Sequence, residues 1–391
     1  MLKRILHLTI PKGQTIFLWG ARKSGKSTFL KSHFPQSIYI DFLDHDSFLT
    51  YSRNPMHLRG YLSTCSKESL ASPIVIDEVQ KVPEILDEVH WIIENMKGTS
   101  FILCGSSLRK LKHSGANLLG GRAWSQLFLP LCYPELDHFD LLKIFNNGLI
   151  PSHYLEESYP KKALKGYIGN YLIPEVQWES RVRQMSGFTR FLEVIAISNG
   201  QILNYSNIAR ESAMSARTVQ AYVDLLVDMF LAYRIYPYTK SQKRQLITSA
   251  PKFYFFDTGV VNAISNRTLS SLKGPEAGHL FEQYVFLELL AYKEIKEKDY
   301  DITYWRTRSG LEVDFVLGKG TVALEVKLSK SISVSDIHGI IEFAKESKPQ
   351  YVAVICLETH PRQMTVEGVD IMILPVESFL KMLWGDQLPL S

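Results

Sequence analysis

The chain has 391 residues, of which 46% are hydrophobic and 21% charged, and its formal net charge is +4. A chain of this length and hydrophobicity can fold as two or three domains rather than one. The small net charge, with both signs spread along the sequence, does not by itself indicate a nucleic-acid partner, so any basic surface has to be local.

The cysteines and the apolar runs exclude several classes of protein. The cysteines form no CxxC pair, which argues against a disulfide framework and against a zinc knuckle. They are Cys65, Cys104, Cys132 and Cys356. No apolar run approaches the about 20 residues that a membrane-spanning helix needs, and the first residues do not build a signal-peptide core. We therefore expect a cytoplasmic protein with no membrane partner.

The first part of the chain alternates between strand-like and helical patterns. Short β-branched or apolar runs occur at TIFLW, SIYIDF, SPIVID and TSFILCG, with a helix expected from Lys26. This alternation predicts an α/β domain with a parallel sheet. The polar stretch KHSGANLLGGRAWSQ and the proline-containing LFLPLCYPEL end the pattern, so we expect the first domain to occupy residues 1–140.

A phosphate-binding motif follows the first predicted strand. Gly20, Gly25, Lys26 and Ser27 match the P-loop pattern G-x-x-x-x-G-K-[ST]. The glycines let backbone N–H groups point at a phosphate, and the next helix offers its positive end. Lys26 adds charge for the β- and γ-phosphates, and the Ser27 hydroxyl suits Mg²⁺. ATP and Mg²⁺ are thus the expected cofactors. The predicted binding residues are Gly20, Ala21, Arg22, Lys23, Ser24, Gly25, Lys26, Ser27 and Thr28.

Polar residues at the ends of later strands supply the remaining parts of a hydrolysing site. SPIVIDE ends in Asp77, expected to hold Mg²⁺ through a water, and Glu78, expected to orient the attacking water. Ser106, after TSFILCG, is expected to sense the γ-phosphate, with capping of the next helix as the alternative. Arg122 is expected to stabilise the transferred phosphoryl group, either within one chain or across a homo-oligomer interface; a solvated surface arginine is the alternative.

These segments resemble a known family. GARKSGKST, IDEVQKVP, LCGSS, GGRAW and LPLCYPE look like the AAA-type P-loop ATPases of bacteria and archaea that carry a C-terminal partner domain of unknown function, and the resemblance covers nearly the whole chain. It implies that Lys26 and Ser27 form the Walker A site, that Asp77 and Glu78 form the Walker B site, and that Ser106 occupies the sensor position. The family more often has Thr-Gly-Ser where this chain has Cys-Gly-Ser-Ser at positions 104–107.

The middle of the chain, residues 141–260, is expected to be mostly helical and to contain a winged helix-turn-helix. Ile208 and Ala209 would lie on its first helix, and Ser215 would cap its second. The second helix would turn Val219, Tyr222, Val223 and Leu226 inward, and Arg217, Thr218 and Gln220 toward a major groove.

The segment after this motif is basic. Residues 240–252 contain no acid and would form a wing that meets phosphates. Its cations are Lys240, Lys243, Arg244 and Lys252. Contact with DNA and contact with protein both stay open, because such modules also connect domains or proteins.

Residues 261–391 are expected to form an α/β unit with a helix at FEQYVFLELLAYKEI and strands at TYWRT, LEVDFVL, TVALEVKL and YVAVICL. If Asp314 opposes Glu325 on adjacent strands, both carboxylates can hold a second divalent metal while Lys327 positions a water or phosphate. A slip of one residue would abolish that site. Glu282, on the preceding helix, could add a further carboxylate.

The order Glu282, Asp314, Glu325, Lys327 resembles the PD-(D/E)xK nuclease superfamily, which implies a restriction-endonuclease-like fold. An active nuclease and an inactive scaffold both stay open. Three functions are therefore under consideration: an ATPase that acts on DNA, a nucleotide-switched protein-interaction module, and an ATP-gated nuclease.

Overall fold

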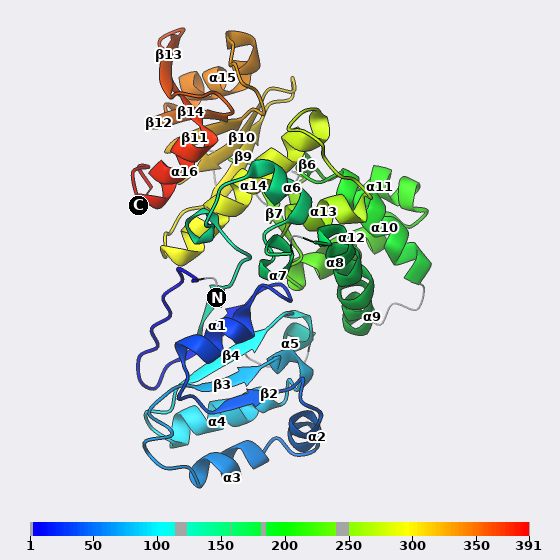
Figure 1. The fold of residues 1–391 in the computed structure, drawn as a ribbon, viewed down its shortest axis with the longest axis vertical. Helices are drawn as coiled ribbons and strands as arrows, with labels where there is room; N and C mark the ends of the chain where they lie inside the picture. Colours follow the sequence, from blue (N-terminus) through cyan, green and yellow to red (C-terminus); the bar gives the residue numbers. More distant parts are fainter. Residues whose placement is uncertain (1–2, 114–122, 157, 181–184, 240–249, 391) are drawn as a thin grey trace.

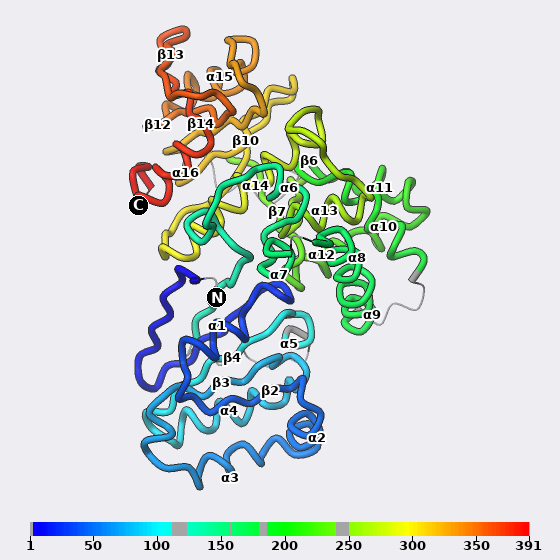
Figure 2. The backbone as a smooth tube through the Cα atoms, in the orientation of Figure 1, coloured from blue at the N-terminus to red at the C-terminus, as the bar shows by residue number. Residues whose placement is uncertain are grey.

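The computed structural model describes residues 3–113, 123–156, 158–180, 185–239 and 250–390. Figure 1 shows a β-sheet domain formed by the first part of the chain at one end of the molecule and a second sheet, formed by the last part, at the other. Helices of the middle segment lie between them and to one side. The tube in Figure 2 traces the connection from the first sheet through α6 and α7 into these helices.

The N-terminal sheet is fully parallel, as predicted, with strand order β2-β3-β4-β1-β5. Its strands are β1 (Thr15–Trp19), β2 (Tyr39–Asp41), β3 (Ile74–Asp77), β4 (Phe101–Gly105) and β5 (Ala123–Leu127). The first four match the predicted runs. Strand β5 was missed, because AWSQL has neither the apolar run nor the alternation of a typical strand and leaves the sheet edge largely exposed.

Helices cover both faces of this sheet because side chains alternate along each strand. Ile16 and Leu18 pack with Phe29 and Leu30 of α1 (Lys26–His33) in one core. Phe17 faces the other side, where α4 (Ile85–Asn95) packs. The short helices of this domain are α2 (His45–Arg53), α3 (His57–Ser63) and α5 (Arg109–His113).

The middle segment begins with a run of helices: α6 (Leu141–Asn147), α7 (Pro151–Tyr154), α8 (Pro160–Tyr167), the π-helical turn η4 (Ile168–Leu172), α9 (Ile173–Ser180) and α10 (Met185–Ile197). It continues with β6 (Gln201–Ile202), α11 (Tyr205–Ser212), α12 (Ala216–Asp228), β7 (Ala232–Ile235), β8 (Lys252–Phe255) and α13 (Thr258–Ile264). The three strands form an antiparallel sheet in the order β6-β8-β7.

The predicted turn between α11 and α12 is present. Ala213 takes a left-handed conformation with φ of 56°, and the Ser215 hydroxyl accepts a hydrogen bond of 3.1 Å from the Thr218 N–H at the start of α12. Val219, Val223 and Leu226 are buried, Tyr222 is half-buried, and Arg217 and Gln220 are exposed. The sequence pattern therefore predicted which face of α12 is buried.

The C-terminal unit is a mixed six-stranded sheet in the order β13-β14-β12-β11-β10-β9. Its strands are β9 (Ile302–Arg306), β10 (Glu312–Leu317), β11 (Val322–Val326), β12 (Tyr351–Cys356), β13 (Arg362–Val366) and β14 (Val369–Pro375). Helix α15 (His338–Ser347) packs on one face, and α14 (Pro275–Ile295) and α16 (Val376–Trp384) pack on the other. Strands β13 and β14 and helix α16 are elements that the sequence analysis did not anticipate.

The middle and C-terminal units share one hydrophobic core. Phe188 and Val223 of the middle segment belong to the same buried cluster as Tyr284 of α14 and Phe315 of β10. Helix α14 is therefore buried around most of its circumference, because it lies between two packed units. The N-terminal sheet keeps separate cores on its two faces.

No helix among the described residues is long and apolar enough to cross a membrane. All four cysteines are free thiols, and three of them are buried. This matches the absence of a disulfide pattern in the sequence.

Candidate nucleotide-binding site

Three neighbouring parallel strands create the site. Strands β3, β4 and β1 are adjacent in the sheet, and Trp19 at the end of β1 pairs with Gly105 at the end of β4. Because parallel strands end at the same edge, the residues that follow them come together there. The P-loop, the Asp77–Glu78 pair and Ser106 therefore meet, as the sequence analysis required.

The P-loop needs its glycines for two different reasons. Gly25 has a φ of 99°, a conformation that side chains disfavour. At Gly20 the limit is space, since a Cβ atom would lie 2.2 Å from the backbone oxygen of Phe128. Lys23 is a non-glycine residue with positive φ, 65°. The loop is thus held in an unusual backbone conformation between β1 and α1.

The Lys26 ammonium lies inside the loop, where it is 5% exposed. Its Nζ donates to the backbone oxygens of Gly20 at 2.8 Å and Ala21 at 3.0 Å. Nearby, the buried Ser24 hydroxyl has no hydrogen-bond partner among the residues that the structure describes. Phosphate oxygens are suitable acceptors for both groups, so these residues fit a polyphosphate.

Asp77 receives two hydroxyl donors on one oxygen. Ser27 Oγ donates to its Oδ2 at 2.6 Å, and the Tyr39 hydroxyl donates to the same oxygen at 2.5 Å. Burial, together with the Asp77 charge, raises the pKa of Tyr39 well above its ordinary value, so Tyr39 stays a donor. A serine hydroxyl and a carboxylate are the hard oxygen ligands that Mg²⁺ prefers, so the residues present fit Mg²⁺.

Glu78 is held in a strained conformation. It has a φ of 57°, in the left-handed region, directly after β3. Its Oε2 accepts hydrogen bonds from Gln80 Nε2 at 2.6 Å and from Ser106 Oγ at 3.2 Å, and Gln80 also donates to Ser106 at 3.0 Å. The candidate base and the candidate sensor are therefore linked directly.

The middle segment reaches this site through Glu175 of α9. Glu175 Oε1 accepts from Ser106 Oγ at 3.0 Å, and its Oε2 lies 3.5 Å from Arg22 Nη1. Burial raises the pKa of Glu175, and the Glu78 charge acts in the same direction while Arg22 opposes it. Tyr171 adds a second contact, with its ring 4.2 Å from Lys23 Nζ. Two P-loop residues thus touch the middle segment.

Four residues of this region were not predicted from the sequence. Tyr39 lies on β2 beside β3, and Gln80 lies in the 3-10 turn Val79–Lys81 that follows Glu78, but nothing in their local sequence marks them as functional. Arg4 binds the Ser24 backbone oxygen at 2.9 Å and Glu135 at 2.9 Å, which attaches the N-terminal segment to the loop. Glu175 comes from a different unit, so only tertiary structure reveals it.

A cavity of about 560 Å³ lies beside the P-loop. Gly25 and Thr28 line it together with Phe29, His33 and Pro151, and its lining is mainly apolar. This volume falls in the range of small-molecule sites. Thr28, predicted to bind phosphate, thus faces a space next to the loop.

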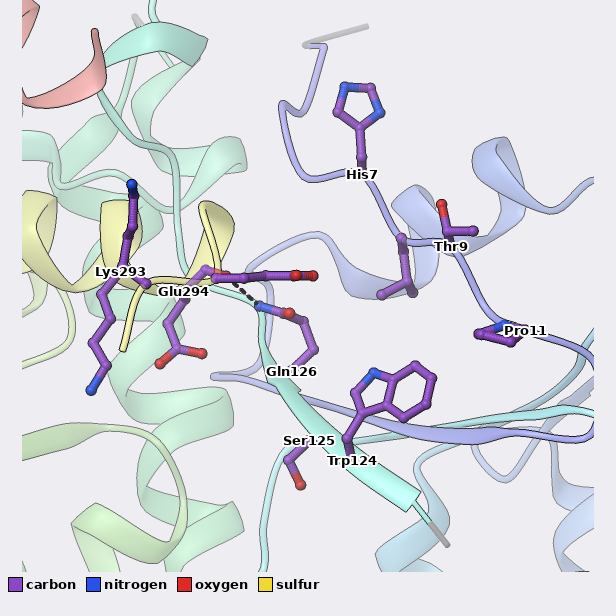
Figure 3. A pocket seen from close by; sticks show the side chains of 11 residues that line it. His7, Thr9, Pro11, Trp124, Ser125, Gln126, Lys293 and Glu294 are labelled. Atoms are coloured by element: carbon purple, nitrogen blue, oxygen red, sulfur yellow. Dashed lines mark hydrogen bonds between the residues drawn. The ribbon is translucent and has the colours of Figure 1, made fainter. Parts of the chain in front are cut away.

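A second cavity, of about 500 Å³, is remote from these groups. Figure 3 shows it between the N-terminal segment, Trp124 and Gln126 of β5, and the end of α14, where Gln126 donates to the backbone oxygen of Glu294 at 3.2 Å. No predicted P-loop or catalytic residue lines it. We assign it no role in nucleotide binding.

Several predicted residues fall outside the described ranges: Arg122, Lys240, Lys243 and Arg244. Their roles stay predictions. Lys252, in contrast, is described, and its assignment to a phosphate-binding wing is wrong. It is 3% exposed on β8, with its Nζ at 2.7 Å from Glu282, 2.5 Å from Glu312 and 3.3 Å from Asp314.

The predicted C-terminal carboxylates do come together. The pairing of Phe315 with Leu324, continued by one residue, sets Asp314 opposite Glu325, the register on which the site depended. Lys327 pairs with Glu325 at 2.6 Å. Burial raises the pKa of Glu325 to about 8, with the Asp314 charge acting in the same direction. Yet as the side chains lie, with Lys252 among the carboxylates, no group of three or more His, Cys, Asp or Glu among the described residues could hold a metal ion, so the second metal is unsupported.

Family comparisons divide the chain into three matched parts. Residues 12–137 match an AAA domain, residues 139–271 match a domain of unknown function (DUF8612), and residues 277–379 match another domain of unknown function (DUF4143).

Similar proteins come from both bacteria and an archaeon. An uncharacterised protein of Mycobacterium tuberculosis is 23% identical over 85% of this chain and 74% of its own length. An uncharacterised protein of Haemophilus influenzae is 21% identical over 90% of this chain and 91% of its own length. One of Methanocaldococcus jannaschii is 23% identical over 94% of this chain and 85% of its own length. A Walker-type ATPase of Pyrococcus abyssi aligns at a TM-score of 0.43 with 15% identity, over 64% of this chain and 90% of that one.

The AAA match covers the P-loop, Asp77, Glu78 and Ser106, the residues that the sheet brings together. Residues 12–137 are therefore an AAA-type, ATP-binding domain of P-loop architecture.

Proposed function

We propose that the protein hydrolyses ATP at the edge of its N-terminal sheet and that the middle segment responds to the nucleotide. Residues 20–28 would enclose the phosphates, with Lys26 on the β- and γ-phosphates. Ser27 and Asp77 would hold Mg²⁺, which neutralises phosphate charge when bound. Glu78 would orient the attacking water, and Ser106 would link it to the γ-phosphate.

The hydrogen bond between Ser27 Oγ and Asp77 Oδ2, 2.6 Å long, carries this proposal. It connects the P-loop, which follows β1, with the carboxylate at the end of β3, so the two groups that would hold Mg²⁺ lie in one place. A passive phosphate pocket would not need Glu78 as well, strained in its backbone and hydrogen-bonded to Ser106. The cavity of about 560 Å³ beside Gly25 and Phe29 offers an apolar space next to the loop for the base.

Hydrolysis of ATP by the purified chain, measured as phosphate release, tests the proposal. Lys26→Ala should abolish Mg²⁺-dependent turnover, whereas Lys67→Ala, an exposed lysine of the same domain, should leave it unchanged. Glu78→Gln should keep ATP binding and lose turnover, because only the base is removed. Full turnover in the Lys26 variant would overturn the proposal.

We further propose the division into domains 1–140, 141–260 and 261–391, with a winged helix in the second and a restriction-endonuclease-like fold in the third. The helix, strand, helix, helix, strand, strand order of α10 to β8, with sheet order β6-β8-β7, supports the winged helix. Asp314 lies opposite Glu325, and Glu282 of α14 contacts the same lysine as Asp314; this arrangement supports the nuclease-like fold.

A second candidate function is DNA binding through α12. Arg217 and Gln220 are exposed at its N-terminal end, where a helix of this kind enters a major groove. Binding to duplex DNA should weaken with added salt, because phosphate contacts release counterions, and should weaken again in Arg217→Ala. Absence of salt-dependent binding would favour a protein partner, and with it a nucleotide-switched interaction module.

A further inference from the structure

The carboxylates of the C-terminal unit surround an amine of the chain itself. Lys252, the first residue of β8, extends from the middle segment into the group formed by Glu282 of α14 and by Glu312 and Asp314 of β10. Its Nζ lies 2.7, 2.5 and 3.3 Å from one oxygen of each. Nζ donates hydrogen bonds to Glu282 Oε1 and Asp314 Oδ1, and Glu312 adds an ion pair, so all three carboxylates contact one ammonium.

The surrounding groups hold the carboxylates in place. The Tyr254 hydroxyl donates to Glu282 Oε1 at 2.6 Å, the oxygen that Lys252 also contacts. The Val326 N–H donates to Asp314 Oδ2 at 2.9 Å. Glu325 Oε2 is buried and has no hydrogen-bond partner in the described part of the chain. The cluster is therefore rich in carboxyl groups, with the Lys252 ammonium in contact with three of them and Lys327 paired with Glu325.

This arrangement does not fit a divalent metal ion. Mg²⁺ requires oxygen ligands at about 2.0–2.1 Å in near-octahedral geometry. The oxygens of Glu282 and Asp314 that would serve it are already bound by the Lys252 ammonium, and two cations in contact with the same oxygens repel each other. Lys252 is 3% exposed, so its charge cannot be moved into solvent without rearranging the cluster.

We propose that the Lys252 ammonium takes the place of the metal ion in this nuclease-like site and joins the middle segment to the C-terminal unit. The carboxylates then bind a divalent cation only after the charge at position 252 has been removed. This rests on the proposed nuclease-like fold of the third domain and is independent of the proposed ATPase function, which depends on other residues.

The cluster is accessible to a test ion. A cavity of about 340 Å³ borders it, with Lys252, Glu282, Glu312 and Arg306 in its lining. A hydrated Mn²⁺ ion can therefore reach Glu282 and Glu312 from solvent, so failure to bind would reflect the occupied centre rather than a sealed interior.

Binding of Mn²⁺ to the full chain without nucleotide tests the proposal, with free Mn²⁺ followed by electron paramagnetic resonance. Asp77→Asn serves as the background, so that the N-terminal site adds no ion. In this background, Lys252 should prevent binding below millimolar Mn²⁺. Lys252→Gln should add one bound Mn²⁺ ion per chain, and Asp314→Asn introduced into the Lys252→Gln protein should remove that ion again. Lys252→Arg, which keeps the charge, and Lys330→Gln, an exposed lysine of the same unit, should add none.

Two results would overturn the proposal. One is a Mn²⁺ equivalent bound by the chain that retains Lys252 and lost on Asp314→Asn. The other is a folded Lys252→Gln protein, checked by circular dichroism, that binds none. If Lys252→Gln does not fold, the measurement with Lys252 in place still decides, because binding that depends on Asp314 contradicts the proposal and its absence supports it.

Discussion

Replacing Glu175 by Gln should tighten ATP binding. The Glu175 carboxylate contacts Ser106 at 3.0 Å and Arg22 at 3.5 Å, two groups that the γ-phosphate of ATP would use in the proposed site. It therefore competes with the nucleotide and repels it. Gln has the same shape and can still accept from Ser106, but it carries no charge.

The size of the effect follows from Coulomb's law for a γ-phosphate charge placed near the Glu175 carboxylate. Two unit charges roughly 5 Å apart at an effective dielectric constant of about 20 interact by roughly 3 kcal/mol. The Glu175 side chain is 12% exposed, and its raised pKa shows that the charged form is disfavoured, so only part of that energy applies. We expect a gain of about 1–2 kcal/mol, which corresponds to roughly a 5- to 30-fold lower Kd.

Titration of a fluorescent ATP analogue into the full chain, at fixed ionic strength and saturating Mg²⁺, measures this Kd. Glu193→Gln is the matched control, because it removes the same charge from an exposed position on α10. Weaker binding in Glu175→Gln would show that Glu175 orders Arg22 for the nucleotide and would refute the competition argument. An equal gain in the control would assign the effect to net charge.

Two further predictions concern Mg²⁺ and pH. Tyr39→Phe removes a donor from Asp77 Oδ2, and loss of such a partner of a metal ligand should raise the Mg²⁺ concentration for half-maximal ATP hydrolysis about tenfold; an unchanged Mg²⁺ titration would contradict this. His153 of α7 is 2% exposed, and burial, with the Lys23 charge, lowers its pKa to about 4. Folding favours the neutral His153 imidazole. Its contribution to the free energy of unfolding is therefore complete above about pH 6.5 and is lost as the pH falls through 4. Between pH 7 and pH 4.5, the free energy of unfolding, measured with denaturant, should therefore fall by about 2–3 kcal/mol more in the wild type than in His153→Phe. An equal fall in both proteins would refute the assignment.

The parts of the N-terminal domain that could be predicted are those whose conformation depends on a few consecutive residues. The P-loop glycines are needed where the backbone turns, and Asp77 and Glu78 follow an apolar run whose strand character is visible in the sequence. Parallel pairing then brings the ends of β1, β3 and β4 to one edge. Strand β5 was missed because an edge strand with exposed polar side chains lacks the usual pattern.

The C-terminal cluster shows where local inference ends. The turn between β10 and β11 left the strand register open, and only the paired backbone sets Asp314 opposite Glu325. Lys252 belonged to a basic stretch that resembled a solvated wing, yet its buried position depends on packing of β8 against α14, which no local pattern encodes.

The sequence by itself determined the nucleotide-binding chemistry, because the P-loop and the acidic pair each lie within a few consecutive residues whose backbone geometry follows from residue type. Tertiary structure alone decided how the units are connected. Glu175 reaches Ser106 from 69 positions away, and Lys252 reaches Asp314 from 62. Contacts over such separations depend on how whole units pack, and packing is a property of the folded chain rather than of any segment.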